Sequence, residues 1–398
     1  MKVFQICSKS PFPPLEGGPI AMNNITQGLL NAGHVVKVLA VNTPKYNIKT
    51  TDIPESYIIS TNYESVFIDT SIKITDAFFN LFSTKSFNIQ RFISKKFENK
   101  IIEILSFSQF DIVQIESIYI APYIDTIRKH SKAKIILRAH NIEHLIWERL
   151  AFSCTNFVKK AYLKHLAKTL KKYELNIIDK VDGIAAITQL DADFFVSFAQ
   201  FSSVISVPVG INLKNISITP HNREFPGLFH LGSMDWMPNQ EGIRWFVYNV
   251  WSEIIKTFPH IKLFLAGRNM PQWLKNLKIE GVNVVGEVAD AHKFMLSKSI
   301  MIVPLLSGSG MRVKIVEGMA FANTIISTSI GAEGINYINN ENILIADNPN
   351  QFVHEIGKCI NNPDFCNMIG VNAQKMILNN YDNTIVTEKL IKFYKELI

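Results

Sequence analysis

The sequence has few cysteines and no long hydrophobic run. Its four cysteines are scattered among 398 residues, without a Cys-x-x-Cys pair or a histidine at ligand spacing, which argues against a disulfide framework and a zinc site. The longest apolar runs, such as 299–306 and 261–266, are far below the roughly 18 residues that span a bilayer. The first residues also lack the features of a secretory signal. We therefore expect a cytoplasmic globular protein.

Low-complexity segments are absent too, and the length of the chain suits two domains. The net charge is +7, and much of it lies in 156–180, where Phe157, Leu163 and Leu166 are expected on an apolar helical stripe with lysines around it. Two interpretations remain open. The lysines form either a solvated helix face or a patch for an anionic membrane surface, which would place the protein peripherally at the inner face of the membrane.

Strand-like apolar runs alternate with helical segments along the whole chain, which indicates an α/β fold with parallel sheets. The expected strands are 2–7, 35–41, 66–69, 111–116, 134–139, 183–188 and 204–207, then 228–231, 261–266, 282–285, 300–304, 324–327 and 343–345. We expect an N-terminal Rossmann-like domain in 1–208, a linker in 209–225 and a second Rossmann-like domain in 226–378. A last helix in 379–398 is expected to pack back on the first domain.

Residues 304–317 combine a strand end, a turn of small residues and an amphipathic helix. Gly308 and Gly310 let backbone amides approach an anion, and the helix that follows begins with free N–H groups. Glu317 could accept hydrogen bonds from hydroxyl groups. The third glycine of a dinucleotide fingerprint is missing, and no G-x-x-x-x-G-K-[ST] motif occurs, so a NAD enzyme and a P-loop NTPase are disfavoured.

The order of several segments resembles family 4 of the retaining glycosyltransferases. These segments are HLGSMDWMPNQEGIRWF, LFLAGRNMP, VVGEVAD, PLLSGSGMRVKIVEGMA and STSIGAEG, and in the N-terminal half PPLEGGP and RAHNIEHLIWERL. The resemblance implies the GT-B fold, in which two doubly wound domains face each other across a cleft. It also implies transfer of a sugar from a UDP- or GDP-linked donor with retention, without a bound metal or other cofactor.

The resemblance assigns donor-binding residues in the second domain. Glu317 matches a glutamate that holds the donor ribose, whereas Ser309 and Ser233 stand where relatives carry a glutamate and an arginine. The positive charge for the diphosphate is therefore expected from Arg312 and Lys314, with Arg268 as a further candidate. The expected donor-binding residues are Gly17, Gly18, Gly232, Ser233, Arg268, Gly286, Val288, Gly308, Ser309, Gly310 and Met311.

In the N-terminal domain, His140 matches the histidine that relatives place beside the donor sugar. The expected catalytic residues are thus His140, Arg312, Lys314 and Glu317, and Glu116, Asn141 and Glu143 are expected on the acceptor side. Asp191 and Asp193 read as D-x-D, but two residues apart on a helix they point to different sides, so no metal is expected. Asp290 is expected to cap a helix rather than contact the ligand.

The predicted activity is sugar transfer by front-side displacement, a mechanism in which the leaving diphosphate oxygen accepts the proton of the acceptor. We expect the acceptor to be a glycan, free or lipid-linked, in surface polysaccharide or glycoconjugate synthesis, and we expect no nucleic acid partner. Two alternatives stay open. The chain could be a nucleotide-sugar epimerase on the same fold, or a nucleotide-sugar-binding protein without catalysis.

Overall fold

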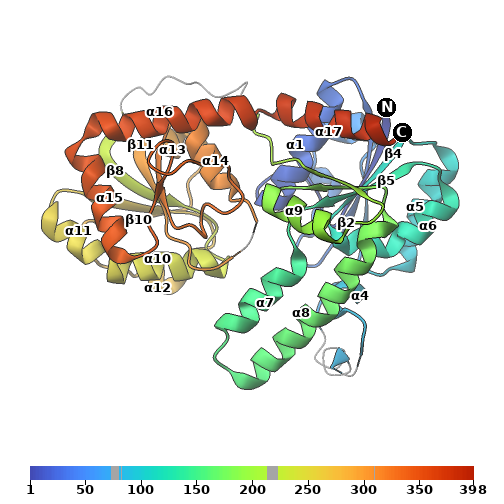
Figure 1. Cartoon of the computed structure of the whole chain (residues 1–398), viewed down its shortest axis with the longest axis horizontal. Helices are drawn as coiled ribbons and strands as arrows, with labels where there is room; N and C mark the ends of the chain where they lie inside the picture. Colours follow the sequence, from blue (N-terminus) through green and yellow to red (C-terminus); the bar gives the residue numbers. More distant parts are fainter. Residues whose placement is uncertain (73–79, 82, 213–222, 309) are drawn as a thin grey trace. The chain divides into compact units, whose positions relative to one another are not determined.

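The computed structural model describes residues 1–72, 80–81, 83–212, 223–308 and 310–398. The chain divides into two compact units: unit 1 is Met1–Gly210 with Asn383–Ile398, and unit 2 is Ile211–Asp382. Part of the expected linker, 213–222, and the expected donor-binding residue Ser309 lie outside the described residues. Figure 1 colours unit 1 from blue to green, with its last helix in red.

In the described part of unit 1, seven strands form a parallel sheet in the order β3-β2-β1-β4-β5-β6-β7. The strands are β1 (Lys2–Cys7), β2 (Val35–Asn42), β3 (Glu64–Phe67), β4 (Ile112–Glu116), β5 (Lys134–Ala139), β6 (Gly183–Ala186) and β7 (Ser203–Ser206). The α-helices are α1 (Gly17–Asn31), α2 (Glu55–Thr61), α4 (Phe87–Gln90), α5 (Lys95–Phe107), α6 (Ile124–His130), α7 (Glu143–Ser153), α8 (Phe157–Ile177), α9 (Gln189–Phe198) and α17 (Asn383–Leu397).

The sheet of unit 1 is covered on both faces, as near-continuous apolar strands of a parallel sheet require. Helices α1, α2 and α17 contribute to one apolar core, and α5, α6, α8 and α9 to the other. Helix α17 lies beside α1 (Figure 1) and buries Leu390 and Tyr394 completely. A side chain at Gly183 would come within 2.7 Å of Phe393, so a glycine is needed where α17 meets β6.

In the described part of unit 2, six strands form a second parallel sheet in the order β10-β9-β8-β11-β12-β13. The strands are β8 (Glu224–Leu231), β9 (Lys262–Ala266), β10 (Val282–Gly286), β11 (Lys298–Val303), β12 (Thr324–Ser327) and β13 (Leu344–Ile345). The helices are α10 (Met237–Asn249), α11 (Trp251–Thr257), α12 (Gln272–Lys275), α13 (Ala291–Leu296), α14 (Val313–Ala320), α15 (Pro349–Asn361) and α16 (Pro363–Asn380).

The expected α/β fold with two parallel sheets is confirmed. Between β8 and β9 the chain forms two helices, α10 and α11, which meet at Val250. Of the residues expected on the apolar stripe of α8, Phe157 is exposed, whereas Leu163 and Leu166 are buried. Asp290 caps α13 as expected, because its carboxylate accepts a hydrogen bond from the Lys293 amide.

In each sheet, the direction in which successive strands are added reverses near the centre. The chain runs from β1 outward to β3 and returns to β4 on the other side of β1, and unit 2 repeats this pattern with β8, β10 and β11. In open parallel sheets, ligands bind beyond the carboxyl ends of the strands at such a switch point. Within the described residues, the structure contains no helix with the length and hydropathy of a membrane span.

Candidate functional site

Lys314, in the first turn of α14, extends to the carboxyl end of β8. Its Nζ donates a hydrogen bond to Asn239 Oδ1 at 2.8 Å and lies 3.3 Å from His230 Nε2. Burial of the ammonium lowers the pKa of Lys314 to about 7, and the nearby charge of Arg312 acts in the same direction. No carboxylate of the described residues lies within salt-bridge distance of this ammonium. Burying an ammonium group among neutral partners costs free energy. An anion bound beside Lys314 would offset this cost, so the site favours an anionic ligand.

His230, in β8, is completely buried and fixes the direction of the lysine. Its Nδ1 lies 2.8 Å from the carbonyl oxygen of Ile302, so Nδ1 carries the proton and Nε2 accepts from Lys314. Burial, and then the charge of Lys314, hold the pKa of His230 well below its usual value. The histidine is therefore a neutral support for the lysine.

Glycines bring the loops after β8 and β9 into contact with each other and with the lysine. A Cβ at Gly232 would lie 3.1 Å from Lys314 Nζ, and one at Gly267 would lie 1.7 Å from the Gly232 oxygen. The Met234 amide donates to the Arg268 carbonyl at 2.9 Å, and the Gly267 amide donates to the Gly286 carbonyl at 2.8 Å. The ends of β8, β9 and β10 therefore form one backbone surface beside the Lys314 ammonium.

Ser233 and Val288 are placed around the same edge. The Ser233 carbonyl accepts from Asn239 Nδ2 at 2.7 Å, and the Ser233 hydroxyl donates to Asp235 at 2.5 Å. Val288 is partly buried and packs against the core of unit 2. The structure thus brings Gly232, Ser233, Arg268 and Gly286 together, while Val288 lies in the loop that follows β10.

Gly308, which follows β11, lies close to Arg312. Gly308 and Gly310 both have positive φ, and a Cβ at Gly308 would come within 2.8 Å of the Arg312 guanidinium. Arg312 precedes α14, is 6% exposed, donates to the Gly310 carbonyl and lies over the Trp236 ring at 5.2 Å. Arg312 is thus buried rather than an exposed helix residue. In this conformation its guanidinium holds its own loop; direct contact with a diphosphate stays a prediction.

Met311, between the turn and α14, is partly buried and packs against the core of unit 2. Glu317 lies further along α14 and is partly exposed, with its Oε1 3.8 Å from His292 Nε2 on α13. The nearby Glu317 carboxylate raises the pKa of His292. Among the described residues, no three His, Cys, Asp or Glu side chains gather as a metal site requires.

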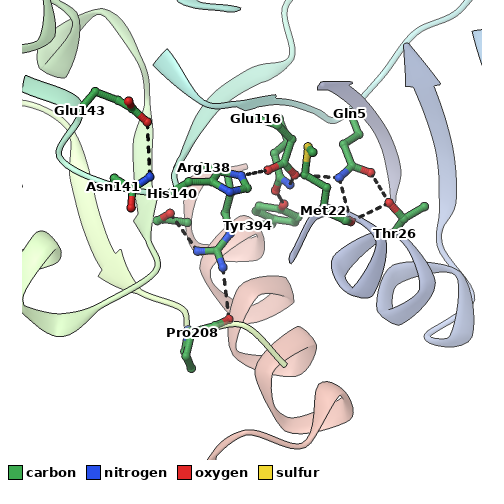
Figure 2. Close-up of polar contacts among 12 residues, drawn as sticks. Gln5, Met22, Thr26, Glu116, Arg138, His140, Asn141, Glu143, Pro208 and Tyr394 are labelled. Atoms are coloured by element: carbon green, nitrogen blue, oxygen red, sulfur yellow. Dashed lines mark hydrogen bonds and ion pairs between the residues drawn. The ribbon is translucent and has the colours of Figure 1, made fainter. Parts of the chain in front are cut away.

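In unit 1, His140 follows β5, and its ring is held by Glu116 at the end of β4 (Figure 2). The distance from His140 Nε2 to Glu116 Oε2 is 2.7 Å. Glu116 is completely buried. Burial opposes its ionisation, but hydrogen bonding and charge from His140, with the charge of Arg138, bring the pKa of Glu116 below its usual value. The carboxylate thus accepts a hydrogen bond from Nε2–H and leaves Nδ1 as the other polar atom of the ring.

This placement differs from the acceptor contact expected for Glu116. Its second oxygen, Oε1, accepts from Gln5 Nε2 at 2.7 Å and from Gln114, and the Gln114 oxygen in turn accepts from the Tyr394 hydroxyl of α17 (Figure 2). Arg138 lies in register beside Glu116 and donates to backbone carbonyls. Glu116 lies behind His140, in a polar network inside the sheet, with no surface left for a substrate.

Asn141 and Glu143 continue from His140 into the first turn of α7. Asn141 Nδ2 lies 3.5 Å from Glu143 Oε1, and the Tyr119 hydroxyl donates to Glu143 Oε2 at 2.9 Å. Burial raises the pKa of Glu143 to about 7, against the hydrogen bond from Tyr119. His140, Asn141 and Glu143 therefore form one polar group at the carboxyl edge of the unit 1 sheet.

Gly17 and Gly18 lie not in a loop but in the first turn of α1, and Glu16 precedes the helix without a side-chain cap. A Cβ at Gly18 would lie 2.8 Å from Lys9 Cε, so the lysine side chain lies over the first turn. The Lys9 ammonium is 3.8 Å from Glu16 and 4.8 Å from the centre of the Tyr46 ring. Burial lowers the pKa of Lys9. The free amides of the helix start and this cation share one location.

Sequence reasoning missed the residues that support the site. His230 and Asn239 lie within the quoted segment HLGSMDWMPNQEG, and a polar residue inside an apolar strand could have signalled His230. Gln5 and Gln114 are a similar signal, because they are polar residues at matching positions of β1 and β4. Tyr394 is more than 200 residues away from the strands it supports, and no local pattern links it to them.

Comparison with known proteins gives one family match. Residues 226–362, within unit 2, match the family model described as "Glycosyl transferases group 1". A protein of Klebsiella pneumoniae described as an uncharacterized 44.6 kDa protein in a cps region is 23% identical over 98% of this chain and 99% of its own length.

Solved structures show the same fold over the whole chain. Sucrose-phosphate synthase from Thermosynechococcus elongatus has a TM-score of 0.71 at 13% identity and covers 100% of this chain and 99% of its own. Anabaena HepE in complex with UDP has a TM-score of 0.68 at 11% identity and covers 100% of both chains. A glycosyltransferase from Rickettsia africae has a TM-score of 0.68 at 15% identity and covers 100% and 98%. Residues 226–362 are therefore similar to glycosyl transferases group 1, and the chain has the GT-B fold of solved glycosyltransferases.

Proposed function

We propose that the protein transfers a sugar from a UDP-linked donor to a glycan acceptor. The observation that carries this proposal is the Lys314 ammonium, which is desolvated, has only neutral hydrogen-bond partners in the described residues and lies beside the Gly232 backbone at the switch point of unit 2. A diphosphate is the ligand that such a cation and a backbone surface fit. HepE has been solved with UDP and with UDP-glucose, which supports uridine as the first nucleotide to test.

In this proposal, Glu317 holds the ribose hydroxyls, and Lys314 stabilises the negative charge that builds on the leaving diphosphate. The transfer retains the anomeric configuration. The leaving oxygen takes the acceptor proton, so the protein needs to supply charge stabilisation rather than a separate nucleophile. His140 acts at the sugar, and Asn141 and Glu143 act on the acceptor side. The cps region in the name of the Klebsiella relative supports a role in polysaccharide synthesis.

Thermal unfolding with a panel of nucleotides and nucleotide sugars tests the donor site. A ligand at 100 times its dissociation constant stabilises a protein by about 2.7 kcal/mol, so UDP should raise the Tm of the wild type clearly and that of Lys314→Met much less. If no nucleotide in the panel stabilises the wild type, the proposed donor site is wrong.

Product analysis separates the proposed transfer from the two alternatives. Transfer predicts that nucleotide release depends on a glycan acceptor. An isomerised nucleotide sugar formed without acceptor would identify an epimerase. Binding of a donor with neither release, hydrolysis nor isomerisation across an acceptor panel would identify a binding protein.

A further inference from the structure

The helical hairpin α7–α8 exposes apolar side chains at its tip. The two helices project from the sheet of unit 1 and are joined by Cys154–Asn156 (Figure 1). The exposed fractions are 85% for Phe152, 84% for Phe157, 77% for Val158 and 46% for Leu150. These four residues lie within nine positions of the chain, on both sides of one turn. A concentration of exposed apolar side chains on a soluble surface marks an interaction site. We call these four residues the hairpin tip.

The base of the hairpin is fixed by buried polar contacts, so the tip is held on a rigid support. Glu174 of α8 accepts hydrogen bonds from the amides of Glu143 and His144 at 3.0 and 3.3 Å, and from His144 Nδ1 at 2.5 Å. A carboxylate at the start of a helix satisfies its free amides and favours its dipole. Between Glu174 and the tip, Leu163, Leu166 and Leu170 of α8 are buried. The exposure of the tip therefore follows from the architecture of the hairpin.

Positive charge begins where the apolar tip ends. Helix α8 contains six lysines and one glutamate, and the glutamate is the buried Glu174. Lys159 and Lys160 directly follow Val158, and the series continues with Lys164, Lys168 and Lys172 at steps of four residues, which places them on one broad helix face. Across the described residues, no carboxylate lies within salt-bridge distance of these lysines. An apolar end beside an uncompensated cationic face complements an anionic lipid surface.

We propose that the hairpin tip inserts into the interface of a bilayer that contains anionic lipid, while the lysines of α8 contact the headgroups. A second copy of the chain is a poorer occupant, because the cationic faces of two tips repel each other. The inference goes beyond the proposed function and does not depend on it, since vesicle binding needs neither donor nor acceptor.

Cys154 offers a direct probe of insertion. It lies in the turn at the tip and is partly exposed, whereas Cys7, Cys359 and Cys366 are buried. An environment-sensitive fluorophore on Cys154 of the full chain should shift to shorter wavelength with vesicles of phosphatidylcholine and phosphatidylglycerol in equal parts. It should shift little with phosphatidylcholine alone. A protein that sediments with the anionic vesicles while the fluorophore remains in a watery environment would overturn the proposal.

Two pairs of matched variants separate the tip from general surface effects. Phe152→Ser with Phe157→Ser should lower vesicle partitioning by about tenfold or more, whereas Phe107→Ser with Phe201→Ser, two sites that are also 85% exposed, should leave it unchanged. Replacing Lys160, Lys164 and Lys168 by Gln should cost roughly fivefold per lysine near the surface. The matched control for lost charge replaces three exposed lysines of α17 by Gln, namely Lys389, Lys392 and Lys395.

The proposal fails if the wild type does not bind anionic vesicles at low salt, or if the control variants lose as much binding as the tip variants. It also fails if the wild type forms a dimer in gel filtration that the Phe152→Ser with Phe157→Ser variant dissolves, because the tip would then be a contact between two copies. If the wild type binds vesicles but transfers no sugar, only the proposed function is contradicted.

Discussion

Lys314 is expected to take up a proton when UDP binds. The pKa of this lysine is about 7, because its ammonium is desolvated, and a diphosphate at Gly232 would hold it in the charged form. Near pH 8, about 90% of the molecules carry a neutral Lys314 before binding, so roughly 0.9 proton is taken up per UDP. Titration calorimetry in two buffers with different enthalpies of protonation measures this number directly.

The affinity should follow the same equilibrium. If only the charged form of Lys314 binds, the apparent Kd scales with the inverse of the charged fraction, which falls from about 0.24 at about pH 7.5 to about 0.03 at about pH 8.5. The Kd for UDP should therefore rise roughly eightfold over this range. The second ionisation of a phosphate group lies near pH 6, so the ligand contributes little to this change.

Two variants check that the proton belongs to Lys314. Lys314→Met should bind UDP weakly and with little dependence on pH, and Lys314→Arg should also show little dependence, because a guanidinium stays charged throughout. The thermal stability of each variant should be measured first, since removal of the lysine leaves His230 Nε2 and Asn239 Oδ1 without this donor. A wild-type Kd that changes less than twofold, together with wild-type affinity in Lys314→Met, would refute the placement of the diphosphate at this lysine.

Five further variants test the remaining assignments. Glu317→Gln should lower kcat/KM roughly 10- to 150-fold, because a ribose diol loses hydrogen bonds to a charged group worth about 1.5–3 kcal/mol; unchanged kinetics would remove Glu317 from the site. His140→Ala should lower kcat about 100-fold with UDP affinity nearly intact, and Glu116→Gln should act in the same sense, since Glu116 fixes the His140 ring; calorimetry with UDP separates the two effects. Arg312→Met should lower kcat about 100-fold with an intact fold, whereas near wild-type turnover in this variant and an inactive Arg268→Met would assign the phosphate contact to Arg268.

The sequence predicts the two sheets well because their strands are runs of apolar and β-branched residues between helical segments. Every strand was expected within a few residues of its observed position. The division of the helical segment before β9 was not expected: α10 ends at Asn249 and α11 begins at Trp251. The apolar period of such a segment does not show where one helix ends and the next begins.

The chemistry of the site was harder to predict than its location. Lys314 was expected because Ser233 stands where relatives carry an arginine, but its low pKa and its contact with His230 depend on packing between β8 and α14, which no local pattern encodes. Phe157 illustrates the opposite error. It continues the apolar stripe of α8, yet it is exposed because that end of the helix lies at the tip of the hairpin, beyond the residues that bury Leu163 and Leu166.

The contribution of α17 to unit 1 determines when that unit can be finished during synthesis. A ribosome makes Tyr394 only after all of unit 2, so the nascent N-terminal portion waits without the residue that donates to Gln114 beneath Glu116. Until then, the apolar surface that Leu390 and Tyr394 cover is open to water or to chaperones. Residues 1–210 produced alone would keep this apolar surface uncovered. The hydrogen bonds from Tyr394 to Gln114 and from Gln114 to Glu116, which support His140, are among the last contacts of the molecule to form.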